Sequence, residues 1–381
     1  RAYRISGTKQ FITNGGVAEL YTILAKTPGG PSFFVIERNS PGLSVGAQEK
    51  KHGIRASNTT QVVLEDVEAP ADQLLGLTEG YGLDQANQVF GFTRLMVASF
   101  GLGAGEEALA RAVAYGHERE QFGEILYRKQ GFTHKLIVPH AVRLEAARAY
   151  CEMVARRLDS GEKGLQVEGA VAKLFATEAG NAAADAAIQA HGGYGYVQEY
   201  EVEKIRRDVR ITTIYEGTSE ILQAIIGTHR WRMCVRSKGG FYREMAGELR
   251  RLGAEEAAAL AADALAELYL VCHATKLPRE QWVMYELARL SAEIETAFEL
   301  AGKAVRDETP QSGLVSACAR LHASSAARDV ASTGLRILQA CGRYSEEEIQ
   351  TWREASGFNA CLKTSTEEME WMDQVAKELE G

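Results

Sequence analysis

The feature that most constrains this chain is an abrupt change in composition near residue 80. Four of the seven prolines lie within residues 1–75. In the same region, short runs of β-branched and aromatic residues alternate with Gly and Pro, a pattern typical of strands joined by tight turns. We therefore predict an all-β unit with strands over residues 3–5, 20–25, 33–36 and 61–64.

The remainder of the chain is predicted to be helical. From Leu83 onward only Pro139, Pro278 and Pro310 interrupt long Ala- and Leu-rich segments with helical spacing. We expect an α+β chain, in which a β-sandwich or barrel-like domain precedes an antiparallel helical bundle and a second, C-terminal helical unit. A basic stretch before Gly239-Gly240 predicts a linker between the two helical units. The predicted domains are residues 1–80, 81–229 and 230–381.

One segment of the second helical unit is similar in sequence to a segment of the first. The segment 188–194 reads Ile-Gln-Ala-His-Gly-Gly-Tyr, and the segment 338–344 reads Leu-Gln-Ala-Cys-Gly-Arg-Tyr. A degenerate duplication of the bundle and a coincidence between two Ala-rich helices that end at glycine both explain the likeness.

The bulk composition excludes several classes of protein. A formal net charge of −8 gives the wrong sign for binding nucleic acid through its phosphates. The six cysteines include no Cys-x-x-Cys pair, and the eight histidines show no ligand spacing, so we predict reduced thiols and no metal site. No apolar run approaches the roughly 20 residues that span a bilayer.

One carboxylate, Glu216, stands between an apolar pair and a glycine. Ile214 and Tyr215 precede it and Gly217 follows it. We expect the apolar pair to desolvate the carboxylate partly, as suits a proton-abstracting base, and the glycine to let a flat substrate approach the backbone. The alternative is a Glu-Gly pair that simply ends a helix.

Two further segments stand upstream of Glu216, and their order is informative. Residues 117–123 read His-Glu-Arg-Glu-Gln-Phe-Gly, and residues 189–196 read Gln-Ala-His-Gly-Gly-Tyr-Gly-Tyr. Together with residues 207–221 around Glu216, these two segments resemble the acyl-CoA dehydrogenase family. The resemblance covers about residues 1–230. The segments 49–59 and 231–381 are most similar to the very-long-chain branch. The resemblance implies that the chain enters partway through the middle β-domain at Arg1 and lacks an N-terminal helical domain.

The resemblance implies a flavin-dependent oxidoreductase of fatty-acid β-oxidation. Oxidation of an acyl-CoA to a trans-2-enoyl-CoA needs a base for the α-proton and an acceptor for a hydride, which no side chain can provide, so FAD is implied. Glu216 would be the base, and the Gly217 N–H would bind the thioester carbonyl. In some branches of the family, the base is the residue directly before the arginine that matches Arg94. In this chain that residue is Thr93, which has no carboxylate. Electrons would pass to electron-transfer flavoprotein.

The implied cofactor contacts fall in several segments. An aromatic-Ile-Thr segment would lie beside the isoalloxazine ring, and an arginine with several glutamines and glycines would hold the diphosphate and adenosine, often across a subunit boundary. Glu220 departs from the family's usual glutamine or aspartate. The complete set is Phe11, Ile12, Thr13, Arg119, Gln121, Gln130, Gln189, Gly192, Gly193, Thr218 and Glu220.

Substrate contacts and assembly are further expectations. Arg94 would support the CoA-binding face, although the usual aspartate three positions earlier is Gly91; a structural charge within the bundle is the alternative. Gly91, Ala98 and Gly101 would leave room for an acyl chain of about 12 to 18 carbons. We expect a homodimer or homotetramer, in a bacterial cytoplasm or a mitochondrial matrix.

Three alternatives stay open at this point. An acyl-CoA oxidase of related fold would react with oxygen directly, and a non-catalytic homologue would act in assembly, although the intact Glu216-Gly217-Thr218 argues against the latter. Independently, the basic segment 230–251, with Trp231, Met233 and Phe241 interleaved, would suit either a membrane surface or a solvated linker.

Overall fold

The computed structural model describes residues 2–306 and 312–380. Arg1, from which an entry partway through a domain is inferred, lies outside them. The described chain divides into two compact units between Phe90 and Gly91. The three-domain division stays a prediction, and its boundary after residue 229 falls inside a continuous helix.

The first unit holds all the long strands. β1 and β5 pair antiparallel, with register shifts between Ile5 and Gly7 and between Lys9 and Ile12, and β4 extends the sheet on the other side of β5. β2 and β3 form a separate antiparallel hairpin. Both sheets bury alternate side chains in one apolar core, and each predicted strand lies within an observed one. The strands are β1 (Ala2–Thr13), β2 (Leu20–Thr27), β3 (Gly30–Glu37), β4 (Leu43–Val45) and β5 (Thr59–Pro70).

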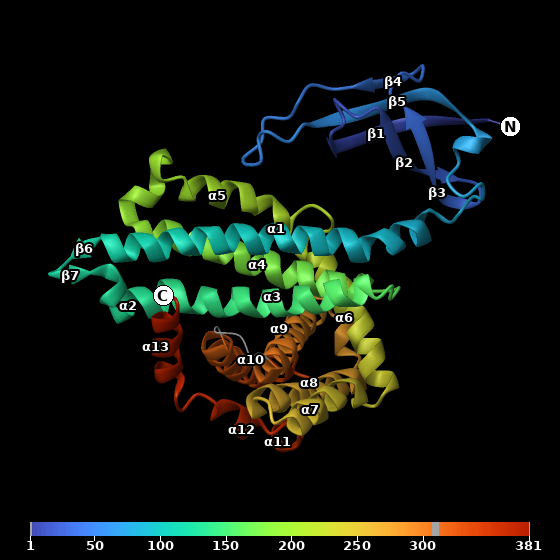
Figure 1. Ribbon diagram of the computed structural model, residues 1–381. Helices are drawn as coiled ribbons and strands as arrows, with labels where there is room; N and C mark the ends of the chain where they lie inside the picture. The colour runs from blue at the N-terminus through green and yellow to red at the C-terminus, as the bar shows by residue number, and fades with distance from the viewer. Residues whose placement is uncertain (1, 307–311, 381) are drawn as a thin grey trace. The chain divides into compact units, whose positions relative to one another are not determined.

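The second unit begins within α1 and is built of helices, apart from the short hairpin β6 (Glu120–Gln121) and β7 (Glu124–Ile125). Figure 1 shows α1, α3 and α4 side by side, and α7 to α10 gathered as a second group. The helices are α1 (Gly82–Glu118), α2 (Gln130–Phe132), α3 (Val138–Asp159), α4 (Gln166–His191), α5 (Val202–Val209), α6 (Ser219–Arg236), α7 (Gly240–Leu252), α8 (Glu256–Ala274), α9 (Gln281–Arg306), α10 (Ser312–Ala340), α11 (Glu346–Ala355), α12 (Phe358–Leu362) and α13 (Glu368–Glu378).

Two apolar cores hold these helices together. The first lies among α1, α3, α4 and α6, and the second among α7, α8, α11 and α12. α9 and α10 contribute side chains to both cores, so the C-terminal helices are packed onto the bundle. α4 and α10, which carry the two similar segments, both end before a glycine with positive φ, Gly192 and Gly342.

Close contact between α1 and α4 depends on glycines in both helices. A methyl group at Gly169 of α4 would lie 2.7 Å from the carbonyl oxygen of Gly91 in α1, and one at Gly101 would lie 2.8 Å from Thr177 Cα. A methyl group at Gly180 would clash with the Gly101 carbonyl. Ala98 is fully buried in the first core. Gly91, Ala98 and Gly101 therefore serve helix packing, and the expectation that they leave room for an acyl chain is wrong.

The segment predicted as a linker or a membrane-facing surface contributes several side chains to the protein core. Arg230, in the middle of α6, is 3% exposed. Its guanidinium forms a bidentate ion pair with Glu295 of α9, at 2.7 and 2.8 Å, and lies 5.0 Å from the centre of the Phe241 ring. Trp231 and Phe241 pack against the second core. The burial of Arg230 contradicts a solvated linker at that residue. Arg232, Met233 and Arg236 of the same helix are exposed, and a membrane-facing surface stays a prediction.

The Arg230–Glu295 pair is part of a larger buried network. The Tyr150 hydroxyl of α3 donates to Glu295 at 3.1 Å, and the Tyr242 hydroxyl of α7 donates to the same carboxylate at 3.2 Å. Arg230 also reaches Glu168 of α4 at 3.2 Å. Because a buried charge is stable only when it is paired and hydrogen-bonded, this network ties five helices, α3, α4, α6, α7 and α9, to one another.

α8 is long and apolar enough to span a membrane, contrary to the sequence-based expectation for the chain. It has 19 residues, and 56% of its apolar window is buried. Its buried side chains, including Leu265, Leu268 and Tyr269, lie in the second core, which is where the core helix of a globular domain places them.

The contact between α1 and α4 gives a first prediction. Gly180→Ala should lower the free energy of unfolding by about 2 to 4 kcal/mol, because the new methyl group overpacks against the Gly101 carbonyl. Gly103→Ala is the matched control, since a methyl group there meets no atom within 4 Å, and it should be neutral or stabilising by up to about 1 kcal/mol. Thermal unfolding of both variants checks this, and equal melting temperatures would show that the helices do not approach as closely as described.

Candidate active site

Glu216 lies in the loop that joins a short 3₁₀ turn, Arg210–Thr213, to α6. Its backbone has φ +55°, and Gly217 has φ +97°, so two consecutive residues adopt left-handed conformations. A non-glycine residue with positive φ stores about 1 kcal/mol of strain and is found mostly where neighbouring contacts hold it in place. The loop is therefore held in a specific, unfavourable conformation.

Side chains from two other helices hold this loop. The Thr93 hydroxyl of α1 donates to Glu216 Oε2 at 3.1 Å. The Lys173 ammonium of α4 donates to the Gly217 carbonyl oxygen at 2.7 Å. On the downstream side, the Thr218 hydroxyl caps α6 by accepting from the Ile221 N–H at 3.4 Å. The carboxylate and the backbone of the loop are thus fixed separately.

The expected desolvation of Glu216 by its apolar neighbours is not observed. The Glu216 side chain is exposed, and so is Ile214, whereas Tyr215 is half-buried. The charges around the loop come instead from Arg94 and Lys173. Burial lowers the pKa of Arg94, while Glu216 acts in the opposite direction.

Arg94 occupies the position that the sequence associates with a substrate contact. It is 5% exposed, and its guanidinium donates to the carbonyl oxygen of Gln166, the first residue of α4, at 3.2 Å. These contacts agree with the alternative of a structural charge within the bundle, and a direct contact with substrate stays a prediction.

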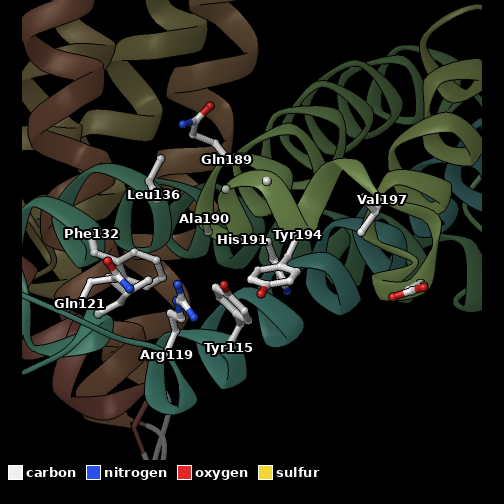
Figure 2. Close-up of a pocket in the computed structure, with 14 residues that line it drawn as sticks. Tyr115, Arg119, Gln121, Phe132, Leu136, Gln189, Ala190, His191, Tyr194 and Val197 are labelled. Atoms are coloured by element: carbon white, nitrogen blue, oxygen red, sulfur yellow. The ribbon is translucent and has the colours of Figure 1, made fainter.

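A second group of predicted residues lines a pocket at the far end of α4. The pocket has a volume of about 700 Å³ and is lined by Arg119, Gln121, Gln189, Gly192 and Gly193, among others. Figure 2 shows Arg119 and the rings of Tyr115 and Tyr194 along its wall. Gln130, at the start of α2, is not part of the lining, although Phe132 at the end of the same short helix is.

The glycine turn gives this pocket its shape. Gly192 ends α4 with φ +59° and ψ −135°, a region that side chains disfavour, and methyl groups at Gly192 or Gly193 would meet no atom within 4 Å. Open space therefore lies directly above the backbone. His191 anchors the turn, because its Nδ1–H donates to the Ala187 carbonyl at 2.7 Å while its ring stacks on Tyr115. Burial lowers the pKa of His191.

The aromatic surface of the pocket also supports Arg119. The Arg119 guanidinium lies 5.7 Å from the centre of the Tyr194 ring, a cation–π distance. A guanidinium fork on a concave wall beside exposed backbone is suited to a diphosphate. The sequence found Arg119 and the glycines, but it did not find Tyr115, which stacks on the turn.

Thr218 and Glu220 line a different pocket of about 330 Å³, together with Arg206, Arg210 and Ser219. This pocket shares no lining residue with the one at Arg119. Hydrogen bonds from the Glu220 backbone N–H and from the Thr218 hydroxyl hold the pKa of Glu220 below its usual range. Apart from Gln130, the predicted cofactor residues of the helical unit therefore line two separate pockets on one chain.

Phe11, Ile12 and Thr13 end β1 in the first unit. Phe11 is 68% exposed and has φ +58°, next to the register shift between β1 and β5. Such a bulge re-aims side chains at a sheet margin, so the exposed ring is free to contact a flat ligand.

Comparison with known proteins relates both units to one family. Residues 1–67 match the family model for the middle domain of acyl-CoA dehydrogenase, and residues 80–230 match the model for its C-terminal domain. An acyl-CoA dehydrogenase of Bacillus subtilis is 41% identical over 234 residues, which are 60% of this chain and 60% of that protein. The chain thus spans about three-fifths of the length of such curated relatives.

Solved structures extend the comparison to the C-terminal helices. An acyl-CoA dehydrogenase of Bacillus anthracis, crystallised with FAD, matches 99% of this chain and 71% of its own, with a TM-score of 0.80 at 22% identity, which shows a common fold. The butyryl-CoA dehydrogenase of Megasphaera elsdenii is 38% identical and matches 60% of each chain, with a TM-score of 0.57.

Proposed function

Because the chain belongs to the acyl-CoA dehydrogenase family, we propose that the whole protein catalyses the FAD-dependent α,β-dehydrogenation of fatty acyl-CoA in β-oxidation and passes electrons to electron-transfer flavoprotein. The observation that carries the proposal is the strained Glu216–Gly217 loop, whose carboxylate and backbone are each held by a side chain of a different helix. Strain restrained in this way is typical of functional sites.

The loop suits proton abstraction next to a carbonyl group. Thr93 donates to Oε2 of Glu216, which leaves Oε1 for the α-proton of a thioester. Gly217 would donate its N–H to the thioester oxygen, where negative charge develops as the proton leaves. The exposed position of Glu216 keeps the carboxylate accessible to substrate.

FAD would supply the hydride acceptor that side chains lack. The residues present fit such a cofactor, because the open glycine turn at Gly192 and Gly193 and the guanidinium of Arg119 suit a diphosphate. Thr218 and the arginines of the second pocket offer further polar contacts. Phe11 would contribute an aromatic face to the ring system.

The alternatives differ in what happens after proton abstraction. An acyl-CoA oxidase would turn over in air without an added electron acceptor, whereas a dehydrogenase requires a mediator. A non-catalytic homologue acting in assembly needs neither the carboxylate nor its hydrogen bond from Thr93, so the Glu216 loop favours an enzyme.

The second prediction concerns Glu216. Glu216→Gln should retain stoichiometric FAD but lose dehydrogenation by roughly 10²- to 10⁴-fold, because an amide cannot take up the α-proton. Anaerobic bleaching of the oxidised flavin by acyl-CoA measures the reductive half-reaction directly. Glu347→Gln, at an exposed position of α11, is the charge-matched control. A Glu216→Gln variant that bleaches at the wild-type rate would place the base elsewhere.

Assembly forms a separate part of the proposal. Apart from Gln130, the predicted cofactor residues of the helical unit lie in two pockets that share no lining residue. This separation supports a homodimer or homotetramer, in which Arg119 of one subunit and Thr218 of another hold the same cofactor.

A third prediction follows for hybrid dimers. Arg119→Gln subunits should bind FAD poorly, and Glu216→Gln subunits should be inactive. Coexpression of the two should restore part of the activity, because one site per hybrid then combines a wild-type Glu216 with the partner's wild-type arginine. Activity of purified, differentially tagged hybrids checks this. Hybrids without activity, or a monomer in light scattering that retains FAD, would refute the shared site.

Acyl-chain length is the least constrained part of the proposal. We propose saturated straight chains of about 12 to 18 carbons, on the resemblance of residues 49–59 and 231–381 to the very-long-chain branch, since each buried methylene contributes about 0.8 kcal/mol while the cavity accommodates it. One solved relative is named as a dehydrogenase of butyryl-CoA, which is a short-chain substrate. Gly91 and Gly101 pack against α4, so these small residues give no support to a long acyl pocket.

The fourth prediction tests this length preference. Across a series from butyryl-CoA to stearoyl-CoA, kcat/KM should be highest among the long chains. A maximum at butyryl-CoA or at a branched acyl group would exclude the very-long-chain assignment while leaving the dehydrogenase proposal intact.

A further inference from the structure

Lys173 is a fully buried charged residue of the helical unit. It lies in the middle of α4, after Val171 and Ala172 and before Leu174, and it is 0% exposed. Among residues 2–306 and 312–380, no carboxylate lies within ion-pair distance of its ammonium. Its hydrogen bond to the Gly217 carbonyl, at 2.7 Å, directs the charge toward the Glu216 loop.

The environment of Lys173 makes this charge unfavourable. Burial, and then the positive charge of Arg94 on α1, lower the pKa of Lys173 to about 8, while Glu216 in the loop and Glu178 on α4 oppose the shift. The free energy of folding therefore includes the penalty of placing an ammonium in the core. A neutral, apolar side chain of similar length would avoid that penalty, so stability alone gives no reason for a lysine here.

We propose that Lys173 is a positioning residue for the Glu216–Gly217 loop: its ammonium holds the Gly217 carbonyl and so keeps both residues in the left-handed conformation that presents the carboxylate and the Gly217 N–H to one substrate. This inference rests on the dehydrogenation proposed above. Lys173 touches neither the substrate nor the reacting atoms; it acts through the backbone of the loop.

Geometry explains why a charged group is needed at this point. The loop strains one non-glycine residue, Glu216, and its side chain is held by a single hydrogen bond from Thr93. Hydrogen bonds from charged donors are about twice as strong as those between neutral groups. α4 is a rigid, buried helix, so an ammonium anchored on it fixes the Gly217 carbonyl within a narrow range. Without it, the loop could relax toward ordinary backbone angles, and the base would lose its alignment with the α-carbon.

Lys173→Met tests the inference in the full-length holoenzyme, with Lys163→Met, at an exposed position of the α3–α4 loop, as the matched control. We expect Lys173→Met to keep stoichiometric FAD and a melting temperature no lower than that of the wild type. The limiting rate of anaerobic flavin bleaching by acyl-CoA should fall by about 10- to 100-fold, with little change in the half-saturating substrate concentration. Lys163→Met should match the wild type in every respect.

The outcomes separate this inference from the proposal on which it depends. A wild-type protein that acyl-CoA does not bleach would refute the dehydrogenation itself. Wild-type bleaching together with an unchanged rate in Lys173→Met would refute only the role of Lys173. A Lys173→Met protein that does not fold, melts lower or loses FAD would show that the lysine is needed for the structure and would also overturn the inference, since stability and rate would then fall together.

Discussion

The candidate active site depends on the close approach of α1 and α4. Glycines on both helices remove the side chains that would otherwise separate them, so that the Gly180 position of α4 lies against the Gly101 carbonyl of α1. This approach brings Thr93 of α1 and Lys173 of α4 to the same short loop, where one binds the Glu216 carboxylate and the other binds the adjacent backbone. A wider spacing between the helices would break one of these two hydrogen bonds.

Several features of the molecule lower the stability of the folded state by themselves, and the packing around them offsets this cost. The loop is strained at Glu216, and Lys173 and Arg94 are buried cations beside it. The two apolar cores supply the stability that offsets these terms, and the network around Arg230 and Glu295 joins the cores. This distribution is typical of enzymes, in which the functional site is locally unfavourable and the remainder of the fold compensates for it.

The sequence predicted the succession of strands and helices, because composition reflects local structure, and its motif order singled out Glu216. It failed wherever the answer depended on which faces of two helices meet. From the sequence, Gly91 and Gly101 suggest space for a substrate, but in the fold they lie in a contact between helices. Arg230 suggests a solvated charge, but it forms an ion pair with a residue 65 positions away. In the sequence, Thr93 stands out only because it carries no carboxylate, and its hydrogen bond to Glu216 becomes visible only in the fold. Lys173 left one usable signal: it is the sole charged residue between Gly169 and Thr177, in a stretch otherwise suited to a buried helix.

The central claim is that the α-carbon–hydrogen bond of a bound acyl thioester breaks before or as the flavin is reduced, with Glu216 as the proposed base. The most direct measurement is the isotope effect of α-deuteration on anaerobic flavin bleaching by the wild-type holoenzyme. Replacing both α-hydrogens of the acyl group with deuterium should slow bleaching several-fold, because the α-carbon–hydrogen bond breaks in that step. Bleaching at the same rate with α-protonated and α-deuterated substrate, with both deuterium atoms still on the recovered acyl group, would contradict this mechanism.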